Sequence, residues 1–159
     1  MIDISMRMFM SAFGADVDYH VSAMTTRTYL DRTNGELLFT TEDFAQASAE
    51  LGSSAAQEMR KNLTIAKRDP TRYLLIKTMS HGDHHDVLQE FLASKWSQDE
   101  ARRSHVQGVY YATKSIGYWL KSVDDDDAIG AYLAFAEQVR VERVEDFLHR
   151  NGVTDFQWT

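Results

Sequence analysis

The sequence predicts an α+β, helix-rich fold, in which a small antiparallel sheet packs on a bundle of about five or six helices. Three observations support this prediction. Residues 28–39 read as strand, polar turn and strand, residues 72–79 form a short apolar segment, and apolar residues recur at helical spacing after residue 83. Because a hairpin alone is rarely stable, we expect 72–79 to pair with it as a third strand.

The first expected elements are a short helix and the N-terminal hairpin. A helix over 2–14 is predicted by four apolar residues at helical spacing, Ile2, Met6, Phe9 and Phe13. Gly14 is expected to end it. In the hairpin, Asn34 and Gly35 tolerate the positive φ angles that hairpin turns require. We therefore interpret Asp31, Asn34 and Gly35 as structural turn residues.

Two helices are expected between the hairpin and the third strand. The first runs over 40–52, with Thr40 or Thr41 as its N-cap and Gly52 at its end. The second begins with Ser53 or Ser54 as its N-cap.

The rest of the chain is expected to be helical. Asp83 suits the N-cap of one helix, and Ser97 with Glu100 forms a capping box for the next. Asp126 or Asp127 suits the N-cap of the last helix. No repeat, linker or low-complexity tract is visible, so we expect residues 1–159 to form a single domain.

The composition excludes several classes of protein. The chain has 159 residues and no cysteine, which excludes disulfides, thiolate nucleophiles and cysteine-ligated zinc or iron–sulfur sites. The net charge of −7 disfavours a generic nucleic-acid binder, which usually has a basic excess. Neither an apolar run of about 18 residues nor a secretion signal is visible, so we expect a cytoplasmic protein without a membrane span.

The densest group of candidate metal ligands lies in the segment SHGDHHD at 80–86. Imidazole and carboxylate groups ligate zinc, nickel and iron, so four residues form a candidate metal site: His81, His84, His85 and Asp86. The alternative is a solvated helix start, because Gly82 disfavours a helix that would place His81 and His85 on one face. No HExxH motif is present, and we expect no cofactor.

Charged and aromatic residues of the C-terminal helices form a candidate binding surface. The cations are Arg102, Arg103, Arg140 and Arg143, which either converge on an anion or pair with carboxylates three or four residues away. The aromatic candidates are Tyr110, Tyr118 and Trp119, which at helical spacing are otherwise core or interface residues. The run DDDD at 124–127 either mimics phosphates or forms a solvated loop.

Four segments of the chain resemble one bacterial family. They are YLDRTNGE at 29–36, DPTRYLLI at 69–76, VLQEFL at 87–92 and AYLAFAEQVRVERVEDFLHRNGV at 131–153. In the same order, and over nearly the whole chain, they are similar to segments of uncharacterised protein family 0158. The chain departs from that family at Asn34, usually Thr, at Lys77, commonly Pro, and at the altered Ser-His-Glu of 80–83. The resemblance implies a small cytoplasmic bacterial protein and transfers no catalytic residues.

These observations together predict a small acidic interaction or regulatory protein without enzymatic activity, which binds another protein through a groove or helix face. A phage-type inhibitor or nucleic-acid mimic is a variant of this prediction. No GxSxG, P-loop or GxGxxG motif is present. Two alternatives stay open, a metal-binding protein or hydrolase that uses the cluster at 81–86, and a nucleic-acid-linked regulator that uses the C-terminal arginines. The aromatic helix faces also suit a homodimer.

Overall fold

The computed structural model describes residues 1–13, 26–78 and 81–159, with only the backbone described at 81 and 82. These residues form seven α-helices and five β-strands, so the predicted α+β, helix-rich fold is confirmed. The chain divides into two compact units, Met1–Thr78 with Val144–Thr159 (unit 1) and Met79–Arg143 (unit 2). The expectation of a single domain stays a prediction.

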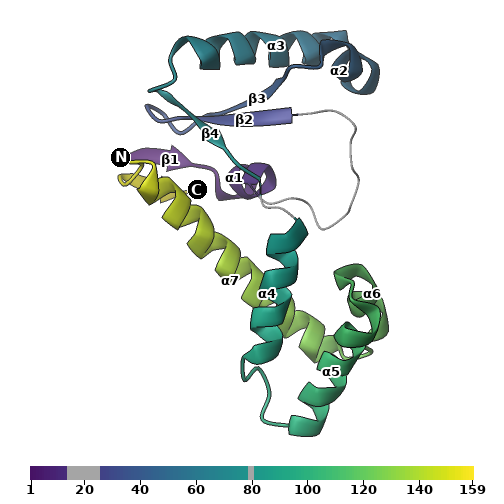
Figure 1. The fold of residues 1–159 in the computed structure, drawn as a ribbon. Coiled ribbons are helices and arrows are strands. Elements are labelled where there is room, and N and C mark those ends of the chain that lie inside the picture. Colours follow the sequence, from purple (N-terminus) through teal and green to yellow (C-terminus); the bar gives the residue numbers. More distant parts are fainter. Residues whose placement is uncertain (14–25, 79–80) are drawn as a thin grey trace. The chain divides into compact units, whose positions relative to one another are not determined.

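The sheet of unit 1 confirms the hairpin and its third strand. Strands β2 (Thr26–Asp31), β3 (Leu37–Thr41) and β4 (Tyr73–Ile76) form an antiparallel sheet in the order β3-β2-β4 (Figure 1). The central residue Leu30 lies opposite Leu37 on one side and Leu74 on the other. Leu30 and Leu74 are both buried, so this register places apolar side chains in the core of the unit.

Helices α2 (Phe44–Leu51) and α3 (Ser53–Arg68) lie along one side of this sheet (Figure 1). The N-cap of α2 is Asp43, whose side chain accepts a hydrogen bond from the Gln46 amide. The predicted caps Thr40 and Thr41 are wrong, because both residues still belong to β3. Gly52 ends α2 as predicted.

The start of α3 differs from the prediction. Its N-cap is Gly52, which has no side chain to accept a capping hydrogen bond, so neither Ser53 nor Ser54 caps the helix. Gly52 has a φ of +94°, and with this conformation the chain turns from α2 into α3 without an intervening loop.

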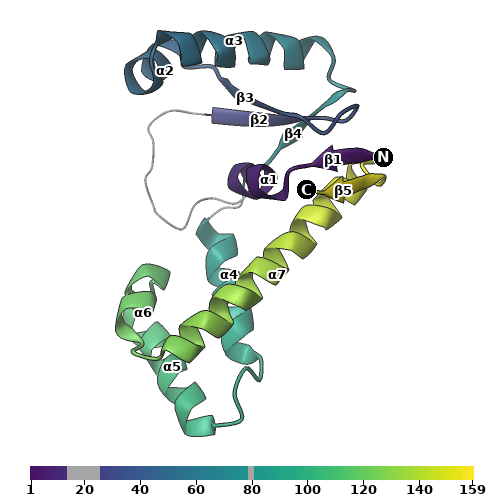
Figure 2. The same cartoon turned by 180° about the vertical axis from the view of Figure 1, so that it is seen from behind.

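Residues 2–13 do not form one helix, so this prediction is wrong for its first residues. Ile2–Ile4 form strand β1, which pairs in parallel with the C-terminal strand β5 (Phe156–Trp158), and α1 spans Met6–Phe13 (Figure 2). The backbone partner that draws residues 2–4 into a strand lies more than 150 residues away, which no local pattern reveals. Gly14, predicted to end the helix, lies outside the described residues.

Unit 2 contains α4 (His81–Ala93), α5 (Glu100–Thr113), α6 (Ile116–Ser122) and residues 126–143 of α7 (Asp126–Arg150). Its core is aromatic. The rings of Trp119 and Phe91 both meet the ring of Tyr132 edge-on, at centroid distances of 5.3 and 5.6 Å. The indole N–H of Trp119 donates to the carbonyl of Val106, which fixes α6 against α5.

Three predicted helix starts in unit 2 are wrong by a few residues. Helix α4 already begins at His81, so Asp83 lies in its first turn rather than at its N-cap. Asp99 caps α5 in place of Ser97, by accepting from the Arg102 amide at 3.1 Å. Asp125, not Asp126 or Asp127, accepts from the Ala128 amide at the start of α7.

The length and polarity of the described helices also bear on membranes. Within residues 1–13, 26–78 and 81–159, no helix is both long and apolar enough to cross one.

Candidate interaction surface

The hairpin turn uses its polar residues for its own hydrogen bonds. Asp31 accepts from the Thr33 amide at 2.9 Å, and Asn34 accepts from the Glu36 amide at 2.9 Å. Gly35 has a φ of +80° and donates its amide to the carbonyl of Asp31. The three predicted turn residues thus lie together in a structural role.

Asp31 also forms a bidentate ion pair with Arg72. Arg72 donates from Nε to Oδ1 at 3.0 Å and from Nη2 to Oδ2 at 2.9 Å, while the Asp31 side chain is only 5% exposed. Burial raises the pKa of Asp31, but the hydrogen bonds from Arg72 and Thr33 outweigh it and hold the pKa below its usual value. We therefore interpret this carboxylate as a structural residue rather than a catalytic one.

The described side chains of the histidine cluster at 81–86 do not form a metal site. His84 is buried, Asp86 is exposed, and Nδ1 of His85 lies 3.1 Å from the hydroxyl of Tyr110. Among side chains that the structure describes, no three histidine or carboxylate groups gather closely enough to hold a metal ion. The side chain of His81 is outside that description.

Most of the predicted cationic residues are engaged in ion pairs. Arg102 binds Asp125 through both Nε and Nη2 and lies 3.4 Å from Asp127. Its hydrogen bonds lower the pKa of Asp125 to about 2. One carboxylate of the acidic run is thus neutralised by an arginine 23 residues away, a pairing that the expectation of near-neighbour pairs did not include.

The other three arginines differ in their partners. Arg103 donates to the carbonyl of Ser97 and lies 3.9 Å from Glu100, so the predicted pairing with a carboxylate three or four residues away is confirmed for this residue. Arg143 lies 3.6 Å from Glu90. Arg140 has no carboxylate within 4.0 Å in the described part of the chain. The four cations therefore do not converge on one anion site.

The predicted aromatic surface separates into buried and exposed residues. Trp119 is fully buried and Tyr110 nearly so, which makes both of them core residues. Tyr118, in the first turn of α6, is 65% exposed, and Tyr111, in the last turn of α5, is 63% exposed. The sequence did not distinguish Tyr111 from Tyr110, although Val106 and Tyr110 are four apart and so share the buried side of α5.

The corner between α5 and α6 exposes these tyrosines together with two lysines. Lys114 has a φ of +49° and ends α5, Ser115 caps α6, and Lys121 lies in its last turn. No carboxylate occurs between Glu100 and Asp124. We call the set Tyr111, Lys114, Tyr118 and Lys121 the corner face.

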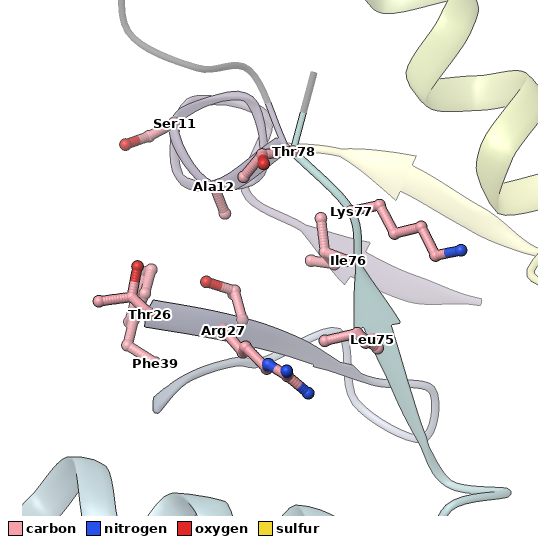
Figure 3. Close-up of a pocket in the computed structure, with 10 residues that line it drawn as sticks. Ser11, Ala12, Thr26, Arg27, Phe39, Leu75, Ile76, Lys77 and Thr78 are labelled. Atoms are coloured by element: carbon pink, nitrogen blue, oxygen red, sulfur yellow. The ribbon is translucent and has the colours of Figure 1, made fainter. Parts of the chain in front are cut away.

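Unit 1 contains a hollow of about 470 Å³ between α1 and the adjoining ends of β2 and β4 (Figure 3). Its polar lining consists of Ser11, Thr26, Arg27, Thr28, Lys77 and Thr78. In Figure 3 the Lys77 side chain extends away from Ser11 and Thr26, so its ammonium does not point into the hollow with the hydroxyl groups. No sequence motif marked these residues as a site, and the hollow lacks the convergent polar groups of a ligand site.

Comparisons with known proteins give no further guide. No protein-family model, no curated protein and no solved structure matches the chain. The resemblance to uncharacterised protein family 0158 therefore stays a prediction.

Proposed function

We propose that the protein is a non-enzymatic interaction protein that binds a partner protein through the corner face. One observation carries this proposal: two tyrosines at the same helix corner are each more than 60% exposed. Tyrosine supplies a large, rigid contact area with a hydroxyl at its tip, and it is enriched at protein interfaces.

The charge of the corner face favours a partner with exposed carboxylates. Lys114 and Lys121 are exposed, and neither has a carboxylate within 4.0 Å among the residues described. Two cations on a chain of net charge −7 give little attraction for a phosphate backbone, whose binding depends on many such contacts. A protein partner therefore fits this face better than a nucleic acid does.

The proposal is tested by affinity capture from the native cell extract at physiological salt, comparing the wild type with Tyr111→Ala/Tyr118→Ala. We expect a partner that the wild type retains and the double variant loses. The matched control is Leu133→Ala, which removes an apolar side chain of similar exposure, 53%, from α7. This control should retain the partner.

Two results would overturn the proposal. One is equal capture by all three proteins, and the other is equal loss in the double variant and the control. Circular dichroism of each variant shows that a loss of binding is not a loss of fold.

A further inference from the structure

We propose that the outer edge of strand β4 binds an extended acidic segment of a partner protein, which adds to the sheet as a fourth strand. This site lies in unit 1 and is separate from the corner face. Backbone groups of β4 point away from the sheet, no described residue pairs with them, and cations lie nearby.

The hydrogen bonds of the hairpin fix which backbone groups of β4 point outward. Asp31 donates to the Glu36 carbonyl and accepts from Gly35, so its groups face β3, whereas Arg32 donates to the Arg72 carbonyl on the β4 side. Residues of an antiparallel strand alternate in this direction. Leu30 therefore pairs with Leu74, and the N–H and C=O of Leu75 point away from β2.

The two edges of the sheet are not equally protected. At the β3 edge, Nδ2 of Asn62 on α3 donates to the outward carbonyl of Phe39 at 3.1 Å. At the β4 edge, no side chain or strand of the described residues pairs with Leu75, which is only half-buried. An open edge of this kind is a template for another strand.

The charge around β4 selects between possible occupants. The segment from Lys67 to Lys77 has four cations, of which Lys67 is paired with Glu42 and Arg72 with Asp31. The other two, Arg68 and Lys77, have no carboxylate within 4.0 Å among the described residues. The register of β2 and β4, continued by one residue, sets Arg27 opposite Lys77, and both are exposed. Like charges opposite one another repel, and carboxylates of a partner strand would relieve that repulsion.

The same cations disfavour a second copy of this chain at the edge. Pairing of β4 with β4 of another copy would bring each copy's Lys77 toward Arg68, which precedes the other strand and has no carboxylate within 4.0 Å among the described residues. Lysine on an edge strand is a common protection against such self-pairing. An acidic extended segment meets no such penalty.

The edge is tested with the full chain and a short peptide of alternating glutamate and valine. Amide hydrogen exchange followed by NMR reports on each backbone group. We expect the peptide to slow exchange of the Leu75 amide at least tenfold, and a lysine–valine peptide of equal length to have no effect.

Leu75→Pro removes the outward N–H without removing a ladder hydrogen bond, because proline is tolerated on edge strands. We expect this variant to lose peptide binding and Leu75→Ala to keep it. Lys77→Glu leaves the backbone unchanged and should weaken peptide binding at least fivefold. If the proline variant does not fold, this variant still tests whether the peptide binds at the β4 edge.

Three outcomes would overturn the proposal. They are no protection of Leu75 by the acidic peptide, protection that rises with protein concentration alone, and protection by a single-stranded oligonucleotide but not by the peptide. The second would mean self-pairing of the edge, and the third a nucleic-acid surface.

Discussion

Arg72 holds Asp31 by two parallel hydrogen bonds, at 3.0 and 2.9 Å, across 41 residues of sequence. The two residues belong to separate segments of the sequence, YLDRTNGE at 29–36 and DPTRYLLI at 69–76. The pair lies beside the β2–β4 ladder and ties the hairpin turn to the start of the third strand. Asp31 and Arg72 thus have a structural explanation that needs no ligand.

Asp31→Asn should destabilise unit 1. The substitution replaces a nearly buried carboxylate with an amide that cannot accept both hydrogen bonds from Arg72, and we expect a loss of about 2 kcal/mol in the free energy of unfolding. Urea denaturation measures the change. Glu36→Gln, at an exposed position of the same turn, is the control and should stay within about 0.5 kcal/mol of the wild type. Equal effects of the two substitutions would contradict a structural role of the ion pair.

Unit 2 should lose stability in acid through Asp125. Arg102 holds the pKa of this carboxyl at about 2, below the unfolded value of about 3.9. A depressed pKa gives stability above about pH 4 that is lost as the pH falls through about 2. The urea midpoint should therefore fall less steeply between pH 4 and pH 2 in Asp125→Asn than in the wild type. Parallel pH profiles would show that the pair contributes nothing to folding.

The local elements of the fold were predictable because local chemistry determines them. The turn at Asn34 and Gly35 and the helix end at Gly52 follow from short patterns that leave few conformational choices. The strand at Ile2–Ile4 was missed because its partner is β5, at the other end of the chain. The predicted helix starts differ from the observed ones because several aspartates, serines and threonines lie near each start. Only the backbone shows which of them is the N-cap.

The candidate site was less predictable than the fold. The sequence placed aromatic residues on the C-terminal helices, but burial divides them, since Trp119 is in the core and Tyr118 is exposed. The break at Lys114 rotates α6 relative to α5, so a single helical periodicity cannot be carried from one helix to the other. The partner of Arg102 is likewise set by tertiary structure, since Asp125 lies beyond two helix ends.

Gly35→Ala should destabilise unit 1 more than Gly52→Ala does. Both glycines have positive φ, at +80° and +94°, so each substitution carries the conformational cost of about 1 kcal/mol or more. At Gly35 a Cβ would in addition overlap the carbonyl oxygen of Asp3, whereas Gly52 has nothing near it. We expect the loss at Gly35 to exceed that at Gly52 by at least about 1 kcal/mol, measured by urea denaturation. Equal losses would mean that β1 shifts away from the turn without cost.

Trp119→Phe, in the core of unit 2, should destabilise the protein more than Tyr118→Ala, on the corner face. The substitution removes the indole N–H that donates to the Val106 carbonyl at 3.1 Å and leaves a void beside Tyr132. Together the lost hydrogen bond and the void should cost about 2–3 kcal/mol in the free energy of unfolding, measured in urea. Tyr118→Ala, one residue away and exposed, should change stability by less than about 0.5 kcal/mol, because its side chain packs little of its surface in the fold. If Tyr118→Ala instead destabilised the protein as much as Trp119→Phe does, the ring of Tyr118 would be part of the core, and the corner face would lose its main contact residue.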